Sequence, residues 1–528
     1  MATGGISLIW LCLLLGLSPA STSVALADNF VHRSNRGEPT TLDPHKTPNG
    51  WETTIDLELF MGLTSGSAEA KVLPGMAESW SADDDGLGFT FHLRDGLTWS
   101  DGAPLTAKDF VWSFRRMLDP ATASPYASLH YPIINARAVN TGAMPPSALG
   151  VHAPDPRTVS IRLSRPAPYY PQLLIHRGLP APRHAIEKFG DDWTKAGVMV
   201  SNGAFTLAEW IPQTHVRVDR NARFFDAANV KIGGQYFIPA ENAQSAFQMV
   251  RSGQLDTLVG FPPEQIDLIR RDLPDFLRLH PLLGVEYIVF NVKRPPFNDR
   301  RVRQALSMLI ERDVIAGKVL GTGERPAWSM VHPETMPGTE ALRPALLAGS
   351  AGERLTRARA LLDDAGFGRD KSLAFEFRTS ANDIVRRMAV AVTAMWKAAG
   401  VEARIVNSDM PVLFSDIREG NFSVARAEWY PEVVDPETYL YLMQSSSGPM
   451  NQSGYANADF DRAMDVAAAE GDGERRLELY RVAEDIAAED QPLAPVFFYA
   501  GRTLVNPRVS GWADHTRNLH PGRFLSIK

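Results

Sequence analysis

Residues 76–112 read MAESWSADDDGLGFTFHLRDGLTWSDGAPLTAKDFVW. Within this stretch, Phe89–Leu93 alternates apolar and polar side chains, which is typical of a strand with one buried face. Two Asp-Gly dipeptides follow the strand and indicate tight turns. Thr106, with Asp109 three residues later, predicts a helix N-terminus with a capping box in which Asp replaces Glu. The stretch therefore predicts a strand, two turns and a helix in close succession.

Strands and helices alternate farther along the chain. Val285–Val292 (VEYIVFNV) is mostly apolar, as a strand buried on both faces is. Ala374–Arg378 predicts another strand, and Val385–Ala399 predicts a helix that ends at Gly400. This alternation indicates the α/β class. The proline-rich segment 165–186, by contrast, is typical of a domain edge.

Length and composition set the broad class of protein. The chain has 528 residues, of which 44% are hydrophobic and 22% charged. That length exceeds what one compact core usually holds, so we expect two or three domains. The net charge is −7, and no basic run or stripe stands out. Nucleic acid is therefore not expected as a partner.

The N-terminus has the features of an export signal. Ile6–Leu17 is an apolar run, shorter than the roughly 20 residues that span a bilayer. Ala25–Ala27 offers an A-x-A cleavage pattern, which predicts a signal peptide over residues 1–27 and a mature chain that starts at Asp28. No Lys or Arg precedes the run, so a membrane anchor and a misassigned start codon are the alternatives. No later stretch is long and apolar enough to span a membrane.

The only cysteine is Cys12, which lies inside the apolar run. Residues 9–11 before it lack the small side chains that a lipoprotein cleavage site needs, so we expect a free periplasmic protein without a lipid anchor. The mature chain then has no thiol. This excludes disulfides, cysteine nucleophiles and thiolate metal sites.

The common catalytic and phosphate-binding motifs are missing. The sequence contains no G-x-S-x-G, H-E-x-x-H, G-x-x-x-x-G-K-[ST] or G-x-G-x-x-G. Its 12 histidines do not follow metal-ligand spacing. A pair of catalytic carboxylates is the alternative, although nothing in the sequence marks such a pair. We therefore expect no enzymatic activity, no metal and no cofactor.

Residues 76–112 resemble the family 5 extracellular solute-binding proteins. The residues that match the family occur in the same order, from AESW through TFHLRDG to WSDGAPLTAKDFV. These are the oligopeptide- and dipeptide-binding receptors of ABC importers. Other parts of the mature chain resemble the same family: 37–45, 201–205, 287–306 and 426–440. The resemblance therefore extends over nearly the whole mature chain.

The resemblance implies an α/β, two-lobed periplasmic binding protein fold with a hinge and an extra domain in the first lobe. The lobes of such a receptor close around the ligand. The implied three domains are domain I over residues 28–60, 190–285 and 500–528, domain II (the extra domain) over 61–189, and domain III (the second lobe) over 286–499.

The resemblance also implies where a ligand's amino group binds. In the oligopeptide-binding members, an Asp three residues after a Trp pairs with the peptide's α-ammonium. Trp429 matches that Trp, and Glu432 stands at the Asp position with one methylene more. Glu432 is thus the expected ammonium partner, and Trp429 and Tyr430 are expected to line the groove. The alternative for Glu432 is a turn residue beside Pro431.

Arg426 and Arg418 match two arginines that those receptors use near the C-terminal carboxylate of short peptides, with one residue less between them. A guanidinium fork suits a carboxylate; the alternative is a surface or lobe-stabilising arginine. Tyr126 matches an aromatic residue that contacts the ligand's main chain. An assisting histidine of the family aligns with Val385, and Glu428 replaces a glycine. These departures weaken the expectation of a general tri- to pentapeptide receptor.

Taken with the export signal, the resemblance predicts a monomeric periplasmic receptor that captures peptides or peptide-like ligands and delivers them to ABC permease subunits in the inner membrane. The fold alone does not determine the ligand, so a dipeptide, a murein peptide or an opine stays an alternative. A chemosensory receptor of the same fold is a second alternative. A periplasmic peptidase is a third, which the missing motifs oppose.

Overall fold

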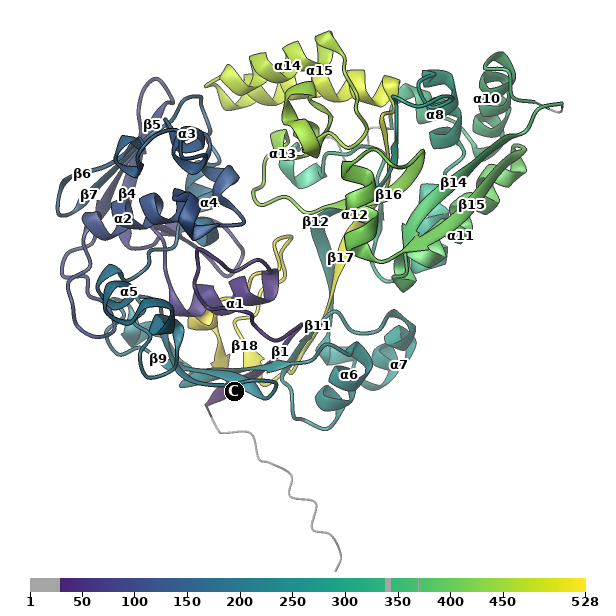
Figure 1. Cartoon of the computed structure of the whole chain (residues 1–528). Helices are drawn as coiled ribbons and strands as arrows, with labels where there is room; N and C mark the ends of the chain where they lie inside the picture. The colour runs from purple at the N-terminus through teal and green to yellow at the C-terminus, as the bar shows by residue number, and fades with distance from the viewer. Residues whose placement is uncertain (1–28, 338–342, 369) are drawn as a thin grey trace, which may run out of the picture.

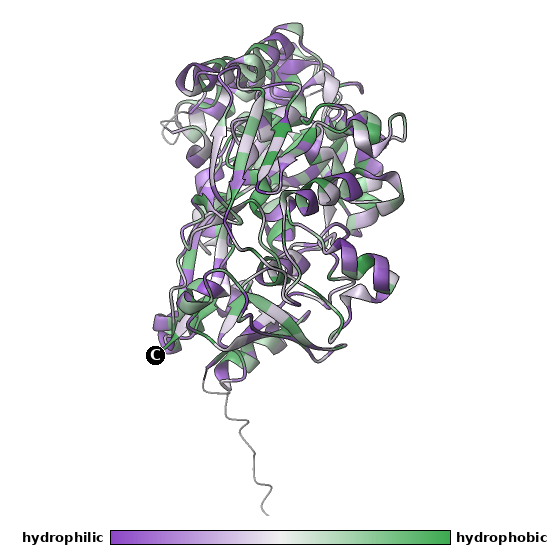
Figure 2. Cartoon of the chain, turned by 90° about the vertical axis from the view of Figure 1, so that its left-hand side faces the viewer, coloured by the Kyte–Doolittle hydropathy of each residue, from purple (hydrophilic) through white to green (hydrophobic). Residues whose placement is uncertain are grey.

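The computed structural model describes residues 29–337, 343–368 and 370–528. The predicted signal peptide, residues 1–27, and its cleavage site before Asp28 lie outside these ranges. Figure 1 shows two lobes. Figure 2 shows apolar and polar residues interspersed along the helices and strands. Over the described ranges, no helix combines the length and the apolarity that crossing a bilayer requires.

An 11-stranded mixed sheet runs through both lobes, in the order β15-β14-β16-β12-β17-β11-β1-β10-β9-β8, with β13 paired to β17. We call the part around β1, β8–β11 and the extra domain the first lobe, and the part around β13–β16 the second lobe. The strands are β1 (Phe30–Asn35), β8 (Phe205–Ile211), β9 (His215–Arg220), β10 (Gly234–Pro239), β11 (Thr257–Val259), β12 (Leu277–Phe290), β13 (Arg325–Pro326), β14 (Leu373–Ser380), β15 (Val401–Ser408), β16 (Val424–Trp429) and β17 (Leu493–Val505).

Two long strands, β12 and β17, connect the lobes (Figure 1). They pair antiparallel from Leu277↔Leu504 to Val289↔Leu493, and the register shifts between Pro281 and Val285. On one side of this irregularity β17 also pairs with β11, and on the other side β12 pairs with β16. An interrupted ladder bends more easily than a regular one, so this point is suited to act as a hinge. The predicted domain boundaries at 285/286 and 499/500 fall inside these two strands.

The stretch 76–112 contributes β4 and β5 to a separate four-stranded antiparallel sheet in the order β4-β5-β7-β6. Its strands are β4 (Ala77–Ala82), β5 (Gly88–Leu93), β6 (Val151–Asp155) and β7 (Thr158–Arg162). The predicted capping box of α2 (Ala107–Leu118) is confirmed, because the Thr106 N–H donates to Asp109 Oδ2 at 2.7 Å. Phe110 and Phe114 of α2 are buried in the first-lobe core.

The predicted strand and helix of the second lobe are also confirmed, as β14 and α11 (Asp383–Ala398). β14 and β15 are parallel neighbours joined by α11. Trp396 of α11 is fully buried and donates to Leu306 O at 2.9 Å. The remaining second-lobe helices are α8 (Arg300–Met308), α9 (Arg312–Val314), α10 (Ala351–Asp364), α12 (Met410–Arg418), α13 (Glu437–Leu440), α14 (Ala458–Ala469) and α15 (Gly473–Asp490).

Both ends of the chain meet in the first lobe. Arg33 on β1 is buried and contacts Glu58 Oε1 at 3.3 Å and His520 O at 3.0 Å. The Gly522 N–H donates to Glu58 Oε1 at 2.8 Å. The remaining first-lobe elements are α1 (Gly50–Leu59), α3 (Ala136–Asn140), α4 (Tyr170–Arg177), α5 (Arg183–Phe189), α6 (Ala243–Arg251), α7 (Ile266–Asp272) and the short pairs β2 (Thr64–Gly66) with β3 (Val72–Pro74) and β18 (Val509–Ser510) with β19 (Ser526–Ile527).

Candidate functional site

Glu432 lies in the loop between β16 and α13 of the second lobe and reaches the first lobe. Its Oε2 is 2.7 Å from His176 Nε2, and its Oε1 is 3.1 Å from Arg177 Nη2. His176 and Arg177 are the last two residues of α4. The side chain of Glu432 keeps 27% of its surface exposed. The expected ammonium partner is thus held by an ion pair between the lobes, with part of its carboxylate still open.

Arg177 brings two of the predicted site residues together. Its guanidinium carbon lies 3.4 Å from the ring centre of Tyr126, which is a cation–π arrangement. The Tyr126 hydroxyl donates to Pro48 O at 2.8 Å, so the ring is tethered. Tyr126 from the first lobe and Glu432 from the second therefore contact the same arginine. No motif in the sequence marks Arg177.

Arg517 completes this cluster from the C-terminal segment. Its Nη2 is 3.1 Å from His176 Nδ1, and its Nη1 is buried without a hydrogen-bond partner in the described chain. Burial and the Arg517 charge lower the pKa of His176 to about 4. A neutral imidazole that donates from Nε2 to Glu432 and accepts at Nδ1 satisfies both contacts. Arg177, Arg517 and His176 are called the basic cluster below.

The charges in the cluster influence one another. Burial alone would raise the pKa of Glu432, but the hydrogen bond from His176 and the Arg177 charge hold that pKa well below its usual range. Burial lowers the pKa of Arg517 to about 10, which leaves the guanidinium charged at neutral pH. Glu432 is therefore ionised and faces two cations.

The two arginines expected near a ligand carboxylate have different surroundings. Arg426 is buried on β16, and its Nε donates to Glu286 Oε1 at 2.9 Å. Arg426 Nη2 also donates to Glu428 Oε2 at 3.0 Å and Tyr499 Oη at 3.2 Å. Arg418, by contrast, is exposed at the C-terminal end of α12. The contacts of Arg426 occupy the fork that a ligand carboxylate would use.

The two predicted groove aromatics lie at the end of β16. Tyr430 is 46% exposed, and its ring centre is 5.1 Å from that of Tyr499. Trp429 is partly buried, and its Nε1 lies buried without a hydrogen-bond partner in the described residues. Tyr430 packs so closely on β12 that a Cβ added to Gly284 would lie 2.2 Å from its ring. Tyr430 is thus packed on the hinge region through Gly284 and Tyr499.

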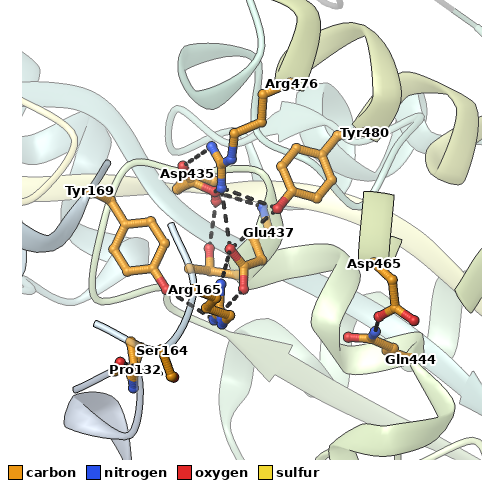
Figure 3. A network of polar contacts seen from close by, with 11 residues as sticks. Pro132, Ser164, Arg165, Tyr169, Asp435, Glu437, Gln444, Asp465, Arg476 and Tyr480 are labelled. Atoms are coloured by element: carbon orange, nitrogen blue, oxygen red, sulfur yellow. Dashed lines mark hydrogen bonds and ion pairs between the residues drawn. The ribbon is translucent and has the colours of Figure 1, made fainter. Parts of the chain in front are cut away.

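A second ionic bridge joins the lobes at Glu437, five residues after Glu432 in the chain (Figure 3). Arg165 of the first lobe reaches Glu437 Oε1 at 2.7 Å, and Arg476 Nη2 approaches Glu437 Oε2 at 3.2 Å. Arg476 also pairs with Asp435 at 2.6 Å, and the Tyr480 hydroxyl donates to Glu437 Oε2 at 3.2 Å. Because Arg476 and Tyr480 belong to α15, they hold Glu437 in place within the second lobe. Arg165 is the residue that links this network to the first lobe.

Residues 71–451 match the sequence family described as "Bacterial extracellular solute-binding proteins, family 5 Middle". The periplasmic oligopeptide-binding protein OppA of Salmonella typhimurium is 36% identical over 517 residues, which covers 97% of this chain and 94% of OppA. A protein of Escherichia coli named as probable deoxycholate-binding periplasmic protein YgiS is 35% identical and covers 96% of both chains.

A solved structure resembles this chain over nearly its whole length. The unliganded open form of the periplasmic murein tripeptide-binding protein MppA superimposes with a TM-score of 0.83 at 32% identity. The match covers 95% of this chain and 98% of MppA. The α/β, two-lobed architecture that the family resemblance implied is therefore confirmed.

Proposed function

The chain belongs to the family 5 bacterial extracellular solute-binding proteins, and from this premise we propose that it is a periplasmic receptor that captures peptides between its two lobes. In this proposal the protein acts as a monomer without catalysis. It delivers the captured peptide to the permease subunits of an ABC importer in the inner membrane.

One observation carries the proposal: the Glu432 loop of the second lobe meets α4 of the first lobe. Glu432 and Tyr126, the residues that resemble ligand contacts in peptide receptors, come from different lobes and share Arg177. A ligand held at this place touches both lobes, so its binding favours the closed arrangement. The irregular β12–β17 ladder supplies the bend that closure needs.

The test starts from protein isolated from the periplasm of its producing cell. Native mass spectrometry should release peptides from it, and calorimetry with those peptides should give saturable binding. Small-angle scattering should show a smaller radius of gyration when the peptides are added. The peptides should be recovered intact after incubation, since cleavage would mean an enzyme. A protein that releases only a non-peptide solute and binds no peptide would contradict the proposal.

Within this function we propose that Glu432 binds the peptide's ammonium group. His176 and Arg177 occupy three of the roughly four acceptor sites of the carboxylate, and the remaining site is on Oε1. Removing one member of a buried ion pair typically costs about 3–5 kcal/mol, or two to four decades in affinity. Glu432→Gln should therefore weaken a peptide with a free amino group far more than its N-acetylated form. If the affinities for the free and the N-acetylated peptide fall equally, Glu432 only joins the lobes and does not bind the ammonium group.

A further inference from the structure

The basic cluster has more positive charge than Glu432 can neutralise. Arg177 and Arg517 are both cationic, and the lowered pKa of His176 leaves its ring neutral at pH 7. Glu432 supplies one negative charge. The nearby carboxyl of Asp56 on α1 is fully buried against Thr47 Oγ1 at 2.9 Å, and burial raises its pKa well above the usual range. Within the described residues, Glu432 is the one carboxylate in ion-pair contact with the basic cluster.

Lobe opening increases this imbalance. Glu432 belongs to the second lobe, whereas Arg177 and Arg517 belong to the first. When the lobes part, Glu432 leaves with its own lobe, and the first lobe keeps the two guanidinium groups beside His176. Within the described chain, Arg517 forms no ion pair. The open first lobe thus presents a site for an anion.

Arg517 has a donor that no other residue of the described chain uses. Its Nη1 is buried and has no hydrogen-bond partner in the part of the chain described. The residue also lines a hollow of the first lobe, together with Leu57, Met61, Ile175 and Leu519. An unpaired buried donor costs free energy that a ligand acceptor can recover. A planar guanidinium fork matches a carboxylate in particular.

We infer that Arg517, supported by the charge of Arg177, forms a carboxylate subsite and that the protein prefers peptides with an acidic residue at the end held by Glu432. The preference rests on the proposed function, because it concerns the same ligand at the same place. The ammonium of such a peptide pairs with Glu432, while its side-chain carboxylate accepts from the unpaired Nη1 of Arg517. The donors of Arg177 are used by Glu432 and Thr53, so Arg177 contributes its charge and not a contact. A neutral first residue leaves the excess positive charge uncompensated and is bound more weakly.

The experiment uses a random library of peptides of two to six residues, equilibrated with the purified protein and identified by mass spectrometry. The wild type should retain peptides with Asp or Glu at the first position on the order of tenfold to a hundredfold over Asn or Gln. Arg517→Gln and Arg177→Gln should remove this enrichment. Arg517→Lys, which keeps the charge but not the fork, should retain part of it. The matched control is Arg183→Gln, which removes an exposed arginine of the same lobe that pairs only locally with Glu187.

The outcomes separate the two ideas. Retention of peptides without acidic enrichment overturns the carboxylate subsite and leaves peptide capture intact. Acidic enrichment that persists in both Arg→Gln variants overturns the assignment to Arg177 and Arg517. Retention of no peptide at all overturns the proposed function, and the acidic preference with it. Circular dichroism of each variant verifies that it is folded before the library is applied.

Discussion

Glu432 Oε1 and Arg177 Nη2 meet at 3.1 Å although 255 residues separate them in the chain. One belongs to the second lobe and the other to the end of α4 in the first, so the contact exists only when the lobes are together. The same short helix turns Gln172 toward the second lobe, where its Oε1 accepts from the Val434 N–H at 2.7 Å. α4 is therefore the surface on which the second lobe rests, and contacts to it control opening.

The Arg165–Glu437 bridge should hold the ligand-free lobes together. Both partners are partly accessible, with 37% and 11% of their side chains exposed, so the pair contributes at most about 1 kcal/mol. Arg165→Gln should increase the radius of gyration of the ligand-free protein in small-angle scattering. High salt should have a similar effect on the wild type. Arg183→Gln is the control and should scatter like the wild type, and identical curves for Arg165→Gln would mean that the bridge does not hold the lobes.

Substitution of Arg426 should destabilise the fold, whereas substitution of Arg418 should not. The side chains of Arg426 and Glu286 are 1% and 0% exposed, so Arg426→Gln leaves a buried carboxylate without its cation. The expected loss in free energy of unfolding is about 3–5 kcal/mol. Arg418→Gln removes an exposed side chain and should change that free energy by less than about 0.5 kcal/mol. Urea unfolding of the two variants gives the comparison, and similar values for both would contradict the buried ion pair.

Gly284→Ala should displace Tyr430, because the added Cβ would lie 2.2 Å from the aromatic ring. The ring packs on Tyr499 at the hinge, so the variant should bind peptide more weakly and close less fully. The same substitution in a Tyr430→Ala background should have little further effect, since the clash is gone. Gly352→Ala in α10, where nothing lies within 4 Å, is the matched control. Unchanged peptide affinity in Gly284→Ala would show that the Tyr430 position is irrelevant to closure.

Acid should destabilise the protein through buried histidines. Burial lowers the pKa of His130 to about 3, and its two ring nitrogens contact Tyr170 Oη at 2.8 Å and Arg177 O at 2.9 Å. The unfolded ring titrates near 6.5, so below that pH the unfolded chain binds a proton that the folded chain refuses. The contribution of His130 to the free energy of unfolding is therefore complete above pH 6.5 and is lost as the pH falls toward 3.

His130→Gln should remove the share of this acid sensitivity that comes from His130. When the pH is lowered from 7.5 to 5, the free energy of unfolding falls in both proteins. The fall should be about 1–2 kcal/mol smaller in the variant than in the wild type. Urea unfolding at the two pH values measures the difference. The exposed His92→Gln variant should keep the wild-type dependence. A pH slope unchanged by His130→Gln would mean that the ring takes up its proton in the folded state.

The helices and strands that could be predicted from sequence are those specified by residues close together in the chain. Thr106 and Asp109 specify a cap within one turn, and the predicted helix over Val385–Ala399 is α11. The strand predicted at Val285–Val292 is longer in the structure and begins at Leu277. Its first part contains Pro281 and precedes Gly284, both of which normally interrupt strands. Only pairing with β17 on both sides of the register shift keeps that part extended.

The site could be predicted in part. The resemblance pointed to Glu432 and Tyr126, and the structure joins both through Arg177. Arg177 itself lay in a proline-rich segment that indicated only a domain edge, and that segment contains α4. Arg517 is 341 residues from His176 in sequence, so no local pattern relates the two. Such pairs depend on the complete fold, and one sequence without its fold does not reveal them.

The meeting of both chain ends in the first lobe has a consequence for biosynthesis. Arg33 and Glu58 are among the first residues of the described chain to be made, yet their partners His520 and Gly522 are among the last. A ribosome must therefore finish nearly the whole polypeptide before the lobe it began can close. Until then the early segments lack the contacts that would lock them into a compact shape. Arg33 and Glu58 therefore stay without these partners until translation is almost complete.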